Sequence, residues 1–156
     1  MKSWPGFATM PDLDDDGDDT VIVTSFAKGK SQFSLRGARV AGKTDALPKA
    51  LTSVDLMPDD QDSETDPDFT RDSKGRRWIS YVDGQRGAGR LLIAPVDAAF
   101  KATGKPFEIT QTGEKASEAR LVAEKDGTIL VVFLKENDAD KSVELITEDL
   151  DCDVVN

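Results

Sequence analysis

A segment that recurs about every 50 residues constrains the fold of this 156-residue chain more than any other feature. The stretch 67–83 (PDFTRDSKGRRWISYVD) aligns with 117–135 (SEARLVAEKDGTILVVFLK), so that Gly75 falls on Gly127, 52 positions later. A third copy covers 8–26. Each copy is a short strand, a turn rich in Asp and Gly, and a second strand rich in β-branched and aromatic residues, which is the pattern of a β-hairpin. Further short strands follow each hairpin, and four strands per repeat are typical of a propeller blade. Between the last two strands of the second copy, we expect the segment 98–104 (AAFKATG) to form one helical turn.

The repeat predicts an all-β chain of about three propeller-like, four-stranded blades, a partial β-propeller. In a single repeat domain we place the blades at 7–57, 67–111 and 117–156, and we expect the acidic stretch 58–66 to be a solvated loop. A β-sandwich whose hairpins only look alike is the alternative. Closed propellers have about four to eight blades, and three sheets leave bare faces and edges. We therefore expect a second copy or another protein to complete the ring; the alternative is that the chain is a piece of a longer polypeptide.

The second copy also resembles the repeats of TolB-like β-propellers. The residues that carry the likeness are Pro67, Phe69, Asp72 and Gly75, an Ile-Ser-Tyr strand at 79–81, a Leu-Leu-Ile-Ala strand at 91–94 and a closing segment at 104–110. The resemblance implies that the first strand of each blade lines a central channel. The chain departs from the family pattern where Ser73 and Lys74 stand between the Asp and the Gly of the turn.

An acidic run, DLDDDGDD at 12–19, comes directly before an apolar strand. Oxygen ligands at alternate positions with a glycine in the loop are what Ca²⁺ requires. An EF-hand is excluded, because Val23 stands where that loop needs a glutamate. The run resembles the calcium loops of FG-GAP-type propeller repeats, which implies Ca²⁺ ligands at Asp12, Asp14, Asp16 and Asp18, although Thr20 holds the last ligand position. A solvated acidic turn without an ion is the alternative.

Composition excludes several classes of chemistry. The chain has no histidine, so Ser-His-Asp triads, Cys-His dyads and His-ligated zinc are absent. A formal charge of −10 and a pI of about 4.5 make nucleic acid and anionic lipid poor partners. The single cysteine, Cys152, lies between two acids, which disfavours its thiolate, and we expect it to pack. The stretch 71–78 resembles the Asp-box of sialidases at Gly75 and Trp78, but Ser73 replaces the signature acid.

No catalytic residue is assigned, because the sequence alone does not single out two positioned carboxylates among 30 acids. We expect a non-enzymatic binding or scaffold module within an oligomer or larger complex. The alternatives are a propeller-type glycosidase or lactonase-like enzyme that uses calcium, and a calcium-binding β-sandwich adhesion domain. The locally cationic second blade predicts a docking patch for an acidic partner at Arg71, Arg76, Arg77, Arg86 and Arg90.

The longest apolar run, 129–134, has six residues and is far too short to span a bilayer. The first ten residues contain no hydrophobic signal-peptide region. Either the protein is cytosolic or a leader has been removed, and of these we expect the second, with an extracytoplasmic location.

Overall fold

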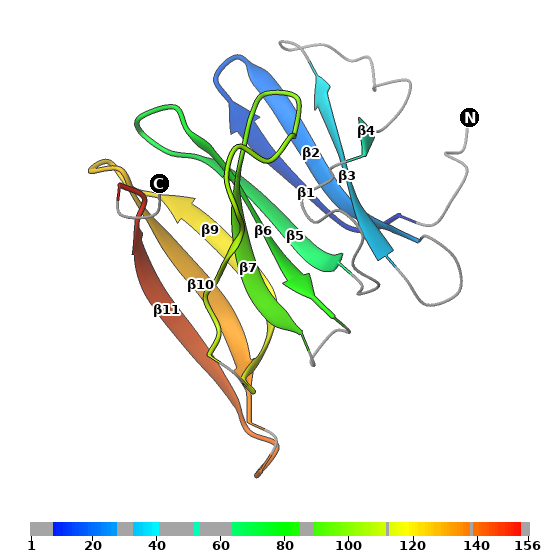
Figure 1. Cartoon of the computed structure of the whole chain (residues 1–156), viewed down its shortest axis with the longest axis vertical. Coiled ribbons are helices and arrows are strands. Elements are labelled where there is room, and N and C mark those ends of the chain that lie inside the picture. The colour runs from blue at the N-terminus through cyan, green and yellow to red at the C-terminus, as the bar shows by residue number, and fades with distance from the viewer. Residues whose placement is uncertain are drawn as a thin grey trace.

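A computed structural model describes residues 8–27, 33–40, 52–53, 64–84, 89–111, 113–137 and 139–153. Within these ranges every regular element is a β-strand, and the strands form three antiparallel sheets (Figure 1). The first sheet contains β1 (Ala8–Asp16), β2 (Asp19–Ala27), β3 (Phe33–Val40) and β4 (Thr52–Ser53). The second contains β5 (Glu64–Arg71), β6 (Arg77–Asp83), β7 (Arg90–Val96) and β8 (Phe107–Glu108). The third contains β9 (Lys115–Ala123), β10 (Thr128–Glu136) and β11 (Val143–Asp151).

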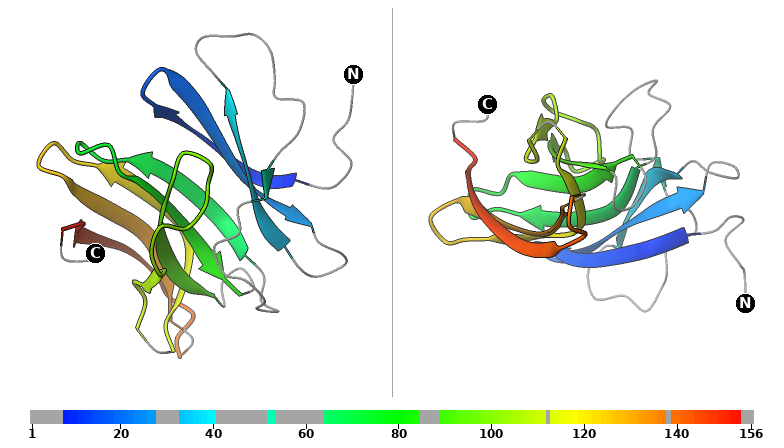
Figure 2. Two further views of the ribbon diagram at one scale, coloured as in Figure 1. Left: turned by 45° about the horizontal axis from the view of Figure 1, so that its top comes forward. Right: turned by 90° about the horizontal axis from the view of Figure 1, so that it is seen from below.

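The three sheets lie in series, with the second sheet between the first and the third (Figures 1 and 2). Strands within each sheet follow chain order, so the first strand of every sheet is an edge strand. These edge strands meet: β5 packs beside both β1 and β9. This arrangement is that of a partial β-propeller, and it confirms the predicted fold class in preference to a two-sheet sandwich. The described part of the chain contains no helix with the length and hydrophobicity that crossing a bilayer requires.

The same irregularity interrupts the first strand of each sheet. Pairing skips two residues in each of these strands: between Thr9 and Asp12 in β1, between Thr65 and Asp68 in β5, and between Ser117 and Arg120 in β9. Such bulges bend a strand and redirect its side chains. The bulged pairs in β5 and β9 are 66–67 and 118–119, which are separated by 52 positions, the offset of the sequence repeat. The three blades are therefore structural copies down to this detail.

The core consists of two apolar clusters, one on each side of the second sheet. The cluster between the first and second sheets includes Val21, Val23, Phe69, Ile79 and Tyr81. The cluster between the second and third sheets includes Trp78, Leu91, Ile93, Val131 and Phe133. Successive side chains of a strand point to opposite faces, and β6 is accordingly buried on both. Tyr81 accordingly lies in the first of these clusters and Trp78 in the second.

Three local expectations differ from the structure. Residues 64–66, which we placed in the acidic loop 58–66, belong to β5, while the rest of that loop lies outside the described residues. The segment after β7 forms a tight turn in place of the expected helical turn, because the Asp97 carboxylate accepts the N–H groups of Ala99 (2.8 Å) and Lys101 (2.9 Å). In the third blade, Asp153 lies in a turn, and the expected fourth strand otherwise falls outside the described residues.

Candidate functional site

Two acidic residues occupy the bulges of adjacent inner strands, the name we give to the first strand of each sheet (β1, β5 and β9). Asp66 in β5 has a φ of 49°, and Glu118 in β9 has a φ of 55°. Such left-handed backbone is costly for a residue with a side chain and is concentrated at functional sites. Each acid stands nine positions before the glycine of its hairpin, Gly75 or Gly127. Sequence reasoning missed this pair, although the nine-residue spacing was present in the aligned repeats. The β1 bulge carries Met10 and Pro11, and so has no acid.

The residue that follows each bulge connects neighbouring blades. Oδ2 of Asp12 in β1 accepts the backbone N–H of Phe69 in β5 at 3.2 Å. One blade further on, Oδ2 of Asp68 accepts the N–H of Leu121 in β9 at 2.6 Å. Asp12 and Asp68 are thus equivalent residues that make equivalent bonds, each holding the inner strand of the next blade. The third residue of this series is Arg120, whose Nε lies 3.8 Å from Oδ1 of Asp68.

The Asp68 carboxyl titrates far from its ordinary range. Burial raises the pKa of Asp68 to about 7, and the negative charge of Asp12, to which it is hydrogen-bonded, contributes in the same direction. The Leu121 N–H and the Arg120 guanidinium lower this pKa and offset only part of the increase. Two carboxyl groups in contact cannot both ionise cheaply, so the pair holds a proton near neutral pH.

A second buried carboxylate, Asp16, lies at the end of β1 and gathers three arginines from other strands. Arg77 Nε lies 2.6 Å from Oδ2 of Asp16, Arg71 Nε lies 3.3 Å from Oδ1, and Arg39 pairs with Oδ2 as well. The Asp16 side chain is fully buried. Burial alone would raise the pKa of Asp16, but the bonds from Arg77 and Arg39 outweigh it, and the pKa is lowered. The charges of the first and second blades therefore compensate each other at this junction.

The four aspartates predicted to bind calcium do not converge. Residues 12–16 form part of β1, a strand, where the calcium prediction required a loop that folds back on itself. Asp12 bonds β5, Asp14 accepts the N–H of Asp15 at 2.7 Å, Asp16 binds arginines and Asp18 is exposed in the hairpin turn. Among the residues that the structure describes, no three acidic or cysteine side chains are grouped to hold a metal ion. Calcium binding stays a prediction, and this geometry does not support it.

The arginines predicted to form a docking patch are engaged within the chain. Arg71 and Arg77 bind Asp16, Arg76 binds acids on both sides of a blade junction, and Arg90 pairs with Asp83. The fifth, Arg86, lies outside the described residues. Their predicted role in binding an acidic partner stays a prediction.

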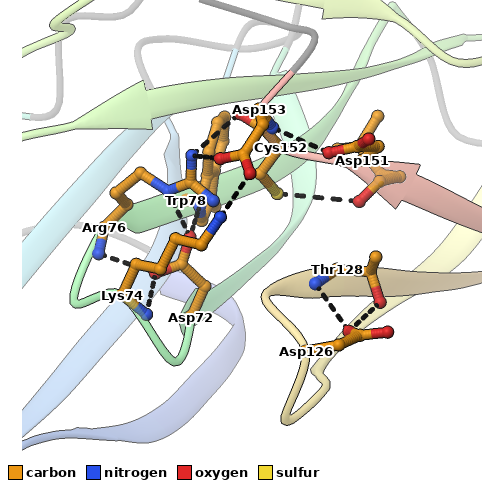
Figure 3. Close-up of polar contacts among 10 residues, drawn as sticks. Asp72, Lys74, Arg76, Trp78, Asp126, Thr128, Asp151, Cys152 and Asp153 are labelled. Atoms are coloured by element: carbon orange, nitrogen blue, oxygen red, sulfur yellow. Dashed lines mark hydrogen bonds and ion pairs between the residues drawn. The ribbon is translucent and has the colours of Figure 1, made fainter.

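The hairpin of the second blade is tied to the C-terminal turn (Figure 3). The buried Asp72 accepts Trp78 Nε1–H at 3.2 Å, Arg76 Nε–H at 2.6 Å and the N–H of Arg76 at 2.8 Å. Arg76 also donates to Oδ1 of Asp153 at 2.8 Å and to the Cys152 carbonyl at 2.9 Å, and Lys74 pairs with Asp153 (Figure 3). Asp72 thus organises this turn. It stands one position before Ser73, which occupies the position of the signature acid of the Asp-box.

Cys152 is buried in the cluster between the second and third sheets, which confirms its predicted packing role. Burial raises the pKa of its thiol to about 11, although Arg76 acts in the opposite direction. We expect iodoacetamide at pH 8 to leave Cys152 unmodified in the folded chain, since the thiolate is the reactive species. Mass spectrometry should show full alkylation in about 6 M guanidinium chloride, where the side chain is exposed. Comparable alkylation rates in both states would contradict the buried placement.

Comparisons with known proteins bear on the fold. No protein-family model and no curated protein sequence matches the chain. Among solved structures, an endo-arabinase from Bacteroides thetaiotaomicron superposes with a TM-score of 0.64 and 11% identity, over 89% of this chain and 55% of that one. A thermostable family-43 glycoside hydrolase superposes with a TM-score of 0.63 and 15% identity, over 88% of this chain and 49% of that one. An exo-1,5-α-L-arabinanase from a bovine ruminal metagenomic library has a TM-score of 0.60 and 14% identity, over 89% of this chain and 50% of that one.

These similarities correct two expectations. The neighbours are propeller glycoside hydrolases, so neither TolB-like repeats nor an FG-GAP-type loop is supported beyond the general propeller fold. The expected non-enzymatic scaffold is wrong on the same finding, which favours the glycosidase alternative. The chain spans about half the length of the structures that it matches. It therefore has the fold of a partial β-propeller of the kind found in family-43 glycoside hydrolases.

Proposed function

We propose that the chain forms part of the catalytic centre of a glycoside hydrolase that acts on arabinose-containing polysaccharides. The observation that carries the proposal is the placement of Asp66 and Glu118 at equivalent bulges of the adjacent inner strands β5 and β9. The proposal extends to an extracytoplasmic location, because polysaccharides do not cross membranes unaided.

The chemistry of glycoside hydrolysis requires two carboxyl groups on either side of the scissile bond. One donates a proton to the leaving-group oxygen, and the other activates water or attacks the sugar ring. A bulge turns a side chain out of the regular alternation of its strand, and bulges are over-represented next to active sites. Asp66 is buried and Glu118 is half-buried. We assign this pair of roles to Asp66 and Glu118. Asp68, two residues from Asp66 and bonded to β9 at Leu121, fixes the spacing of the two strands.

The comparisons support this choice of reaction. Three neighbours are named as arabinases or arabinanases, and they share the blade arrangement over 89% of this chain. Because the chain spans about half of the first of them, we propose that full activity depends on the completed ring.

The test is hydrolysis of arabinan and of an aryl α-L-arabinofuranoside by the ring that contains this chain. Glu118→Gln and Asp66→Asn remove the proton-transferring groups with little change of shape. Each should lower kcat by about 10²-fold or more, since a positioned acid or base contributes roughly that much. Reducing-sugar release measures the first substrate and absorbance the second.

Matched controls are Glu148→Gln and Asp149→Asn, which make the same chemical changes at exposed positions on β11 and should leave kcat unchanged. Circular dichroism confirms that each variant is folded. Unchanged kcat in both bulge variants would contradict the assignment of the two catalytic roles to Asp66 and Glu118. Absence of hydrolysis by the completed ring on arabinan, xylan and their aryl glycosides would remove the proposed function itself.

A further inference from the structure

The side chain of Asp68 lies where the inner strands of all three blades meet. Asp68 belongs to β5, and its Oδ2 accepts the backbone N–H of Leu121 in β9 at 2.6 Å. Its carboxyl group also contacts the carboxyl group of Asp12 in β1. Asp68 is 3% exposed, so water competes little for these bonds. One buried side chain therefore bonds to the inner strand of the blade before it and to that of the blade after it.

The strands that Asp68 joins carry the two acids of the proposed site. Asp66 stands two positions before Asp68 in β5, and Glu118 stands three positions before Leu121 in β9. Both acids lie in bulges, where the ladder to the neighbouring strand of the same sheet is interrupted. Strands β5 and β9 belong to different sheets, so side-chain contacts rather than a backbone ladder join them. The bond from Leu121 to Asp68 is thus a direct link between the two bulged segments.

The charges that face Asp68 come from β1 and β9. Asp12 of β1 is hydrogen-bonded to it, and Nε of Arg120 in β9 lies 3.8 Å from its Oδ1. On β6 the residue opposite Asp68 is the uncharged Ser80. The other strands packed on β5 are β2 and β3, and they contribute apolar side chains: Val21, Val23 and Leu35. Among the charged residues of β2, β3 and β6, Arg39 binds Asp16 and Asp19, Arg77 binds Asp16, and Asp83 binds Arg90.

A proton shared by Asp12 and Asp68 makes these contacts compatible. With the proton present, one carboxyl group donates to the other, and each still accepts an N–H from the next inner strand: Phe69 for Asp12 and Leu121 for Asp68. Without it, two carboxylates in contact repel each other, while the attraction between Asp68 and Arg120 increases. Loss of the proton therefore pushes β5 away from β1 and draws Arg120, which directly follows the bulged pair of β9, toward Asp68.

We infer that Asp68 is a positioning residue for the proposed hydrolysis, which holds the bulges of β5 and β9 at the spacing that the two catalytic acids require for as long as it shares a proton with Asp12. The inference rests on the proposed function, because it concerns the same site. Asp68 is assigned no contact with substrate, and its effect reaches the reaction through the strands that it joins. Misplacement of catalytic groups by about 1 Å costs about 10²-fold in rate, so kcat should fall as the shared proton is lost.

The first experiment follows amide protons by nuclear magnetic resonance and does not require activity. In the ¹⁵N-labelled chain, the resonances of Leu121 and Phe69 should shift with a common midpoint near pH 7, because their acceptors belong to one carboxyl pair. Asp68→Asn should abolish this transition at both amides. The matched control, Asp149→Asn on the exposed strand β11, should keep it. A Leu121 resonance that does not change between pH 5.5 and 8.5 overturns the inference.

The second experiment records kcat and KM of arabinan hydrolysis from pH 5.5 to 8.5 with the ring that contains this chain. Asp68→Asn keeps an acceptor for Leu121 and a donor for Asp12 at every pH. The ratio of kcat at pH 8.5 to kcat at pH 6 should therefore exceed the wild-type ratio about tenfold, with similar KM. Asp68→Leu, which has no acceptor, should lower kcat at both pH values, and if it misfolds the Asp68→Asn comparison decides by itself.

The outcomes separate this inference from the proposed function. Equal pH profiles for the wild type and Asp68→Asn, in a ring that hydrolyses arabinan, overturn the positioning role and leave the proposed function intact. A wild-type ring that hydrolyses no substrate contradicts the proposed function and this role of Asp68 together, even where the amide transition is present.

Discussion

Replacement of Asp68 by asparagine is expected to stabilise the folded chain by about 2–4 kcal/mol at pH 7.5. The folded pKa of about 7 lies above the ordinary value of 3.8, so the folded state binds more protons than the unfolded state between these values. Stability from this group is complete below pH 3.8 and is lost as pH rises to about 7. The difference of about three pKa units corresponds to roughly 4 kcal/mol as an upper bound. Asparagine keeps an acceptor for the Leu121 N–H and supplies a donor for Asp12.

Urea denaturation at pH 4.5, 6.0 and 7.5 measures this effect. The variant and the wild type should have similar free energies of unfolding at pH 4.5 and should diverge progressively toward pH 7.5. Asp149→Asn, on the exposed strand β11, is the matched control and should follow the wild type at every pH. Equal pH dependence in Asp68→Asn and the wild type would show that the carboxyl pair holds no proton in the folded chain.

The second large effect is expected at Asp16, where asparagine should destabilise the chain by about 3 kcal/mol at neutral pH. The substitution leaves Arg39, Arg71 and Arg77 close together without the buried carboxylate that neutralises them. Removing one member of a buried ion pair costs about 3–5 kcal/mol, and we take the lower figure because the arginines are partly exposed. The pKa of Asp16 is lowered on folding, so this stabilisation is present above pH 3.8 and is lost as pH falls below it.

Thermal and urea unfolding of Asp16→Asn, with Asp18→Asn at the exposed hairpin turn as control, measures the effect. We expect the control to lie within about 0.5 kcal/mol of the wild type. The difference in free energy of unfolding between Asp16→Asn and the wild type should become smaller below pH 4. A variant as stable as the wild type at pH 7 would mean that the three arginines do not depend on this carboxylate.

Much of the fold follows from local pattern. The repeat alignment of Gly75 with Gly127 reappears in the bulge registers of β5 and β9, because each hairpin is a local unit whose strands and turn are adjacent in the chain. The opposite orientation of Trp78 and Tyr81 follows from the two-residue period of a strand.

The acidic run before β2 shows what local pattern leaves open. Acids at alternate positions suit a calcium loop, but alternate residues also share one face of a strand, and the sequence alone does not distinguish the two. The choice was made by residues far along the chain: Phe69 supplies an N–H to Asp12, and Arg77 supplies a guanidinium to Asp16, 61 positions away. These partners bond or neutralise two of the four carboxylates, Asp12 and Asp16, while calcium binding stays a prediction.

The sequence by itself determined the blade: its strands and its turn depend on residues close together in the chain, and its threefold recurrence follows from aligning the chain with itself. The tertiary structure alone decided the junctions, and with them the candidate site. Asp66, Asp68 and Glu118 are three acids among 30 until β5 and β9 meet. The left-handed backbone of Asp66 and Glu118 belongs to bulges within single sheets, but the carboxyl pair that holds its proton near neutral pH comes from burial and contacts that exist only when one blade packs on the next.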